Sequence, residues 1–271
     1  MRFRKITAAM TAGAMLLALA GCSDSDENWG TGEAGTDAPE SYTEDSMNNG
    51  AESGYTEQQY DNDGRRFTDG ATQLSMENGK IGINRRTRED SKPMGDSGWT
   101  ILVYLCGTDL ESDCSAASLD IEEALSNAYS DDVRIVYQTG GTNEWNEYYG
   151  ISNGVSQRYV TNNGELELVD EFELCSMGDP DTLADFVSWG VENYPAERMG
   201  LVFWNHGSGS INGVCFDELN DMDSLSLREI DGALNSVYDQ MTDKFEFIGF
   251  DACLMSTLET ANIIAPYARY M

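Results

Sequence analysis

Residues 99–105 read WTILVYL, an uninterrupted run of aromatic, β-branched and leucine residues. A run of this kind is typical of a strand that is buried on both faces of a parallel sheet. Further buried strands are expected at residues 133–137, 199–204 and 245–250. Helical spacing and helix-start signals predict helices at residues 109–129, 181–193, 225–238 and 254–265.

This order of elements predicts the fold class. Strands that alternate with helices over short links form right-handed parallel crossovers. We therefore expect an α/β protein with a mostly parallel, doubly wound sheet and helices on both faces. Residues 148–174 differ, because they alternate and contain the hairpin-turn pairs Asn153-Gly154 and Asn163-Gly164. Small antiparallel strands are expected there.

Two reactive side chains follow directly after predicted strands. His206, the only histidine of the chain, follows the third strand, and Cys253 follows the fourth. Ligands of such sheets bind beyond the carboxyl ends of the strands. A thiol that opens the predicted helix 254–265 would have a lowered pKa, and a nearby imidazole would favour the thiolate further. The backbone N–H groups of Gly207 and Cys253 are the expected donors to an oxyanion.

Each of these residues also has a structural interpretation. A cysteine beside a buried strand is often a small core residue. A histidine at a strand end is often a hydrogen-bonded loop residue. Their joint position at the carboxyl ends of two strands favours catalysis.

The same segments resemble a known family. Residues 201–207 (LVFWNHG) and 247–253 (FIGFDAC) run from hydrophobic strands into His-Gly and Asp-Ala-Cys, the signature of caspase-like cysteine peptidases. Within that group, residues 205–209 (NHGSG), residues 249–255 (GFDACLM) and the opening strand resemble the clostripain family. The resemblance covers residues 99–271 and implies a three-layer α/β/α sandwich with a caspase-like, mostly parallel sheet.

The resemblance implies a Cys-His dyad without a third member, which hydrolyses peptide bonds after Arg or Lys. Cys253 would be the nucleophile, His206 the general base and acid, and Gly207 an oxyanion donor. Asp251 matches an acidic residue of the family's P1 pocket, where a carboxylate suits a basic side chain. The alternative for Asp251 is a cap of the helix that starts near Cys253.

Two departures from the family pattern concern specificity and activation. A second acidic residue of the P1 pocket would fall beyond Met271, so the chain is interpreted as a fragment that lacks it. The resemblance also implies activation by cleavage after a basic residue in the loop that follows the histidine. Residues 213–224 contain no Lys or Arg, so no self-cleavage is expected in that loop.

The N-terminus is predicted to be a targeting signal. A positively charged start and an apolar run end in LAGC at residues 19–22, which resembles a bacterial lipobox. Residues 1–21 would be a lipoprotein signal peptide, and Cys22 would be acylated and hold the protein to a membrane surface outside the cytoplasm. An ordinary signal peptide and an uncleaved anchor are the alternatives.

Residues 22–98 are predicted to be an acidic, polar, disordered linker before the peptidase domain at residues 99–271. Residues 23–64 contain no Lys or Arg, and a segment this acidic cannot bury enough apolar surface to offset its ordering entropy. For residues 65–98, short peripheral strands such as residues 80–83 are an open alternative.

Charge and cysteine content exclude several classes of partner. The net charge of −32 excludes nucleic acid, because phosphate binding needs clustered cations. Five cysteines remain beside Cys22, an odd number that predicts at least one free thiol. Without a CxxC pair and with one histidine, no structural metal is expected. Asp217, Glu218, Asp221 and Asp223 offer calcium as an alternative, but no Gly sits where an EF-hand loop needs one, so a solvated acidic loop is favoured.

The sequence therefore predicts a surface-tethered cysteine endopeptidase that acts on peptides or proteins with Arg or Lys at P1. The alternative from a different class is an inactive, peptidase-like lipoprotein that binds peptides or partners. A thiol hydrolase of another kind on the same scaffold is a third interpretation.

Overall fold

The computed structural model describes residues 70–77, 79–88, 90–127, 130 and 132–271. The predicted signal peptide, the lipidation of Cys22 and the tether before residue 70 lie outside these residues. Seven strands within the described part form one sheet in the order β11-β10-β7-β3-β4-β5-β6. Five of them are mutually parallel, namely β3 (Trp99–Cys106), β4 (Val133–Gly140), β7 (Arg198–Trp204), β10 (Phe245–Asp251) and β11 (Ala268–Tyr270).

The other two strands, β5 (Ser156–Asn162) and β6 (Glu165–Phe172), form an antiparallel edge next to β4. Their turn is Asn163-Gly164, where both residues have positive φ, of 50° and 79°, as a tight hairpin requires. The second predicted hairpin turn, at Asn153-Gly154, is wrong. The short 3-10 helix η1 (Glu147–Tyr149) precedes it in place of a strand, so no hairpin forms there.

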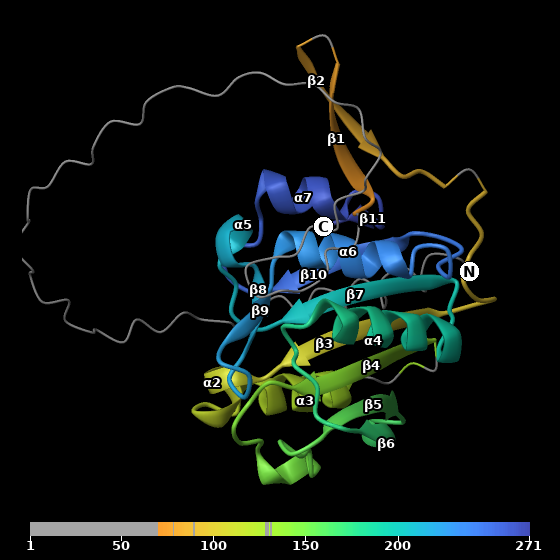
Figure 1. Cartoon of the computed structure of the whole chain (residues 1–271). Coiled ribbons are helices and arrows are strands. Elements are labelled where there is room, and N and C mark those ends of the chain that lie inside the picture. Colours follow the sequence, from red (N-terminus) through yellow and green to blue (C-terminus); the bar gives the residue numbers. More distant parts are fainter. Residues whose placement is uncertain (1–69, 78, 89, 128–129, 131) are drawn as a thin grey trace, which may run out of the picture. The chain divides into compact units, whose positions relative to one another are not determined.

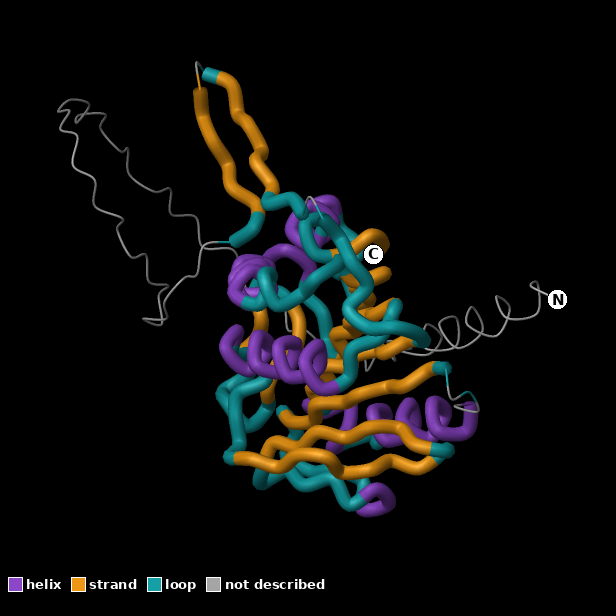
Figure 2. The backbone as a smooth tube through the Cα atoms, turned by 90° about the vertical axis from the view of Figure 1, so that its right-hand side faces the viewer, coloured by secondary structure: helices purple, strands orange, loops and turns teal. Residues whose placement is uncertain are grey.

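Helices cover both faces of the sheet, which confirms the three-layer α/β/α fold (Figure 1). Along β3, Leu102 and Tyr104 belong to one buried cluster, whereas Ile101 and Val103 belong to the other. The first cluster contains residues of α4 (Pro180–Asn193), α6 (Leu227–Ser236) and α7 (Leu258–Ile264). The second contains residues of α3 (Ala116–Asn127). Figure 2 shows the strands side by side with helices on either side of them.

The predicted helix at residues 109–129 is wrong in one respect, because it forms two helices, α2 (Thr108–Ser112) and α3. The Glu111 carboxylate is buried and accepts hydrogen bonds from Ser118 N at 2.9 Å and Ser118 Oγ at 2.5 Å. A side chain of the first helix thus binds the beginning of the second. Ser115 reverses the chain between them with a φ of 54°.

The linker assigned to residues 22–98 also needs a correction over its described part. Residues 72–85 form an antiparallel hairpin of β1 (Thr72–Glu77) and β2 (Lys80–Arg85), so peripheral strands are the correct alternative there. Ala71 N donates to the Asp231 carboxylate of α6 at 3.0 Å. The guanidinium of Arg86 lies 4.2 Å from the ring centre of Tyr238. These partners are far away in sequence, so local composition did not reveal the contacts.

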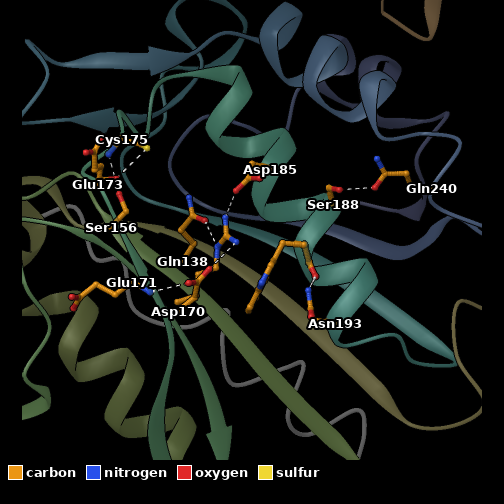
Figure 3. Close-up of polar contacts among 12 residues, drawn as sticks. Gln138, Ser156, Asp170, Glu171, Glu173, Cys175, Asp185, Ser188, Asn193 and Gln240 are labelled. Atoms are coloured by element: carbon orange, nitrogen blue, oxygen red, sulfur yellow. Dashed lines mark hydrogen bonds and ion pairs between the residues drawn. The ribbon is translucent and has the colours of Figure 1, made fainter.

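A buried arginine joins the antiparallel edge of the sheet to α4. Arg158 is 3% exposed, and its Nε donates to Gln138 Oε1 at 2.9 Å. Its two terminal nitrogens bind Asp170 of β6 and Asp185 of α4, and the guanidinium lies 4.6 Å from the ring centre of Trp189. Figure 3 shows Gln138, Asp170 and Asp185 converging on this point from three elements.

The short hairpin of β8 (Val214–Asp217) and β9 (Asp223–Leu225) follows the four-residue helix α5 (Gly209–Asn212) after β7. Asp217 is buried, and its carboxylate accepts hydrogen bonds from Met177 N at 2.7 Å and Leu219 N at 2.8 Å. The predicted acidic loop therefore has one carboxylate in the core and is not solvated throughout.

Candidate active site

The loops that carry His206 and Cys253 emerge next to one another at the carboxyl edge of the sheet. Strands β7 and β10 are parallel neighbours, with Trp204 opposite Asp251. Beyond this pair, Asn205 N still donates to Asp251 O at 3.2 Å. His206 and Cys253 each lie two residues past these paired positions. The sheet therefore brings together the two segments that the sequence analysis selected.

Gly207 fixes how closely these loops approach. A Cβ atom at this position would lie 2.1 Å from the carbonyl oxygen of Cys253, 2.9 Å from Met255 Cγ and 3.1 Å from Ala252 Cβ. Real Cβ atoms do not approach a backbone oxygen this closely, so any side chain would push the loops apart. Glycine is required because the two segments are in backbone contact. The oxyanion assignments of Gly207 and Cys253 remain predictions.

Cys253 does not open a helix, so that expectation is wrong. Helix α7 begins at Leu258, and Thr257 caps it by accepting a hydrogen bond from Thr260 N. Between them the chain turns at Leu254, whose φ of 61° departs from the helical path. A helix dipole therefore does not act on this thiol. The capping alternative for Asp251 is wrong for the same reason, because Thr257 occupies the cap.

The five described cysteines are all outside disulfides. Cys106 and Cys215 are fully buried, and burial raises the pKa of both thiols. Cys106 is thus a core thiol, and its Sγ donates to Phe216 O at 3.3 Å. Cys114 is exposed, and Cys175 and Cys253 are partly buried. Cys106 and Cys114 are thus not joined by a disulfide.

The ring of His206 contacts a carboxylate that the sequence analysis missed. Its Nε2 lies 2.8 Å from Asp109 Oδ1, at the start of α2, and the two side chains are 42% and 52% exposed. Burial alone would raise the pKa of Asp109, but the hydrogen bond and charge of His206 hold it below its ordinary value. Asp109 follows β3, the other neighbour of β7. The strand-end argument that selected His206 applies equally to Asp109.

Asn205 holds the three loops of this edge in place. It is 2% exposed, and its Nδ2 donates to Cys106 O at 2.6 Å and to Thr108 Oγ1 at 2.9 Å. Its Oδ1 accepts from Phe216 N of β8 at 2.8 Å. One buried amide thus connects the ends of β3 and β7 with β8, directly beside His206.

Asp251 lies near a second carboxylate on the α3 side of the sheet. Trp204, its partner in the register, donates from Nε1 to Asp120 Oδ2 at 2.7 Å. Burial first, and the charge of Asp120 second, raise the pKa of Asp251 to about 6. Burial also raises the pKa of Asp120. Two carboxylates that resist ionisation form an environment in which a cation would be stabilised.

The family model for Peptidase_C11, the clostripain family, matches residues 103–271. This chain belongs to the clostripain family.

Two relatives place the clostripain family match in context. Clostripain from Hathewaya histolytica is 32% identical over 117 residues, which cover 38% of this chain and 21% of that protein. The crystal structure of a secreted C11 cysteine protease from Bacteroides thetaiotaomicron, in complex with an irreversible peptide inhibitor, aligns with a TM-score of 0.50. It is 19% identical, and the alignment covers 65% of this chain and 48% of that one. The chain thus spans about half or less of each relative's length.

The clostripain match includes His206, Gly207, Asp251 and Cys253. Among the residues that the structure describes, no three His, Cys, Asp or Glu side chains form a metal-binding group. The prediction that the protein has no cofactor, with calcium as the alternative, stays a prediction. No helix in the described part of the chain is long and apolar enough to cross a membrane.

Proposed function

We propose that this clostripain-family chain carries the catalytic centre of a cysteine endopeptidase that cleaves after Arg or Lys. The observation that supports this best is the backbone contact between the loops of His206 and Cys253. A Cβ added at Gly207 would lie only 2.1 Å from Cys253 O, so the two loops leave no room for a side chain between them. A thiol and an imidazole are thus presented from adjacent strand ends of one rigid sheet.

The chemistry follows from these two groups. His206 takes the thiol proton, and the Cys253 sulfur attacks the carbonyl carbon of the P1 residue, whose π electrons move to oxygen. The N–H groups of Gly207 and Cys253 are the proposed donors to that oxyanion. Collapse breaks the C–N bond, and the amine leaves with the proton from His206. Water then attacks the thioester with His206 as base, which releases the acid and restores the thiol.

Asp251 is the proposed determinant of basic specificity. It lies two residues before the nucleophile, and its partly buried carboxyl group has a pKa of about 6. A cationic P1 side chain would lower that pKa and gain a charge-assisted hydrogen bond. The nearby carboxyl of Asp120 adds negative potential to the same region.

We also propose that the protein works outside the cytoplasm, attached to a membrane by lipid on Cys22, and that its substrates are peptides or proteins. The LAGC segment at residues 19–22 supports the anchor. The related protease from Bacteroides thetaiotaomicron is described as secreted. Mass spectrometry of the membrane fraction would identify a diacylated or triacylated N-terminal Cys22. A soluble product that begins at another residue would contradict the anchor.

Fluorogenic peptides with Arg, Lys or Asp at P1 test the activity. The wild-type chain should release fluorophore from the Arg and Lys peptides and not from the Asp peptide. Cys253→Ala should abolish this turnover. Cys114→Ala is the matched control, because Cys114 is an exposed thiol with no proposed part in the chemistry, so its loss should leave turnover unchanged. Tight binding of the Arg peptide without turnover by the wild type would favour the binding-protein alternative.

A further inference from the structure

We propose that Asp109 is a positioning residue for His206. It accepts the Nε2–H of the neutral imidazole and so leaves the lone pair of Nδ1 to take the proton of Cys253. This inference rests on the proposed function, and it replaces a two-residue centre with three residues from three adjacent strand ends. Asp109 acts through His206 and does not touch the substrate.

The contact has the geometry that such a function needs. The Nε2–Oδ1 distance of 2.8 Å is that of a charge-assisted hydrogen bond. A carboxylate only accepts hydrogen bonds, so the neutral ring must carry its proton on Nε2. The unprotonated nitrogen is then Nδ1. When the ring takes the thiol proton, the adjacent negative charge stabilises the imidazolium.

The fold holds Asp109 in place from several sides. Strands β3 and β7 are in parallel register, with Leu105 opposite Trp204, so the loop after β3 emerges beside His206. Gly107 N donates to Gly140 O at 2.9 Å, and Thr108 N donates to Gly141 O at 3.0 Å. These bonds tie the loop to the end of β4.

The residue before Asp109 has an unusual backbone conformation. Thr108 has a φ of 44°, which a β-branched residue rarely adopts. Asn205 donates to Thr108 Oγ1 at 2.9 Å and is the direct neighbour of His206 in sequence. The amide that fixes the histidine loop therefore also holds the strained residue that aims Asp109.

A structural ion pair would behave differently from a positioning residue. Both side chains are about half exposed, and ion pairs of that kind contribute little to stability because solvent screens them. Removal of the Asp109 charge should therefore leave the unfolding midpoint almost unchanged. The loss should instead appear in steps that use the imidazole.

The kinetic test compares Asp109→Asn with Asp113→Asn, an exposed aspartate four residues later. With a P1-Arg peptide, Asp109→Asn should lower kcat about 10- to 100-fold with little change in KM, because orientation of a general base is lost. Asp113→Asn should match the wild type. In a His206→Ala background, Asp109→Asn should have no further effect on the residual rate or on the alkylation rate of Cys253 by iodoacetamide. Equal kcat values for Asp109→Asn and wild type would overturn the proposal.

A second measurement is independent of turnover. The chain has one histidine, so long-range ¹H–¹⁵N spectra of histidine-labelled protein report on His206 alone. The wild type should show the Nε2-protonated tautomer, and Asp109→Asn should show a mixture. A wild-type ring protonated on Nδ1 would overturn the assignment, even if the peptidase activity were present. A wild type inactive on every peptide, but with the expected tautomer, would count against the proposed function and not against this contact.

Discussion

Replacement of Asp251 by Asn should make the protein more stable and less active. The pKa of Asp251 is raised from 3.8 to about 6 by burial and by Asp120, so ionisation of this carboxyl is unfavourable in the folded state. Each pKa unit corresponds to about 1.4 kcal/mol, which gives an upper bound of about 3 kcal/mol above pH 6. The side chain is only partly buried, so solvent screening reduces the expected gain to about 1–2 kcal/mol.

The two pKa values also determine how the contribution of Asp251 to stability changes with pH. Because the folded pKa lies above the unfolded one, the folded state binds the extra proton between about pH 4 and pH 6. The contribution of Asp251 is thus fully present below about pH 4 and is lost as the pH rises through about 6. Asp251→Asn removes this loss, so its advantage over the wild type should grow between those two pH values.

Urea unfolding at about pH 4 and about pH 8 gives the free energy of unfolding of the wild type and of Asp251→Asn. The variant should exceed the wild type by more at the higher pH than at the lower one. Asp113→Asn serves as the control for loss of an exposed charge. In parallel, kcat/KM for P1-Arg and P1-Lys peptides should fall at least about tenfold in Asp251→Asn. A variant that gains no stability at the higher pH relative to the lower one would refute the assignment of a costly carboxylate. Unchanged cleavage of basic peptides would refute its place in the P1 pocket.

Three further predictions follow from the structure. Gly207→Ala should lower the free energy of unfolding in urea by about 1–3 kcal/mol, because the added Cβ would lie 2.1 Å from Cys253 O. Gly154→Ala is the control and should cost little, because its Cβ would lie 3.7 Å from the nearest atom; equal effects of the two changes would contradict the tight loop contact. Arg158→Met should lower the free energy of unfolding by about 2–4 kcal/mol, because the buried Gln138 Oε1 loses its hydrogen-bond donor. No change in urea unfolding would show that this arginine does not hold the edge strands. After prolonged incubation of the active enzyme, mass spectrometry should find residues 213–224 uncleaved, because that loop contains no Lys or Arg. Cleavage within the loop would exclude strict specificity for basic residues.

The sequence predicted the sheet well because buried parallel strands need continuous apolar runs. Residues 99–105, 199–204 and 245–250 correspond to β3, β7 and β10 to within one residue at each end. The strand-end rule also placed His206 and Cys253 at one edge of the sheet, since parallel strands have their carboxyl ends together. These features depend on local composition and on topology, which a single sequence contains.

What the sequence did not predict depends on contacts between distant residues. The break between α2 and α3 comes from the buried Glu111 carboxylate, whose burial cannot be seen in a segment with helical spacing. The turn after Cys253 comes from the positive φ of Leu254, a conformation that leucine does not favour. The Asp109–His206 contact joins residues 97 positions apart, and the resemblance had implied no third residue. Such features follow from packing and not from local propensity.

Covalent labelling shows whether Cys253 is the thiol that His206 activates. A peptidyl-lysine acyloxymethyl ketone would be incubated with the chain, and the modified residue would be identified by peptide mapping. We expect one label per chain, on Cys253, with Cys114 and Cys175 unmodified and the rate strongly reduced in His206→Ala. A label on another cysteine, or equal rates in the wild type and His206→Ala, would contradict it.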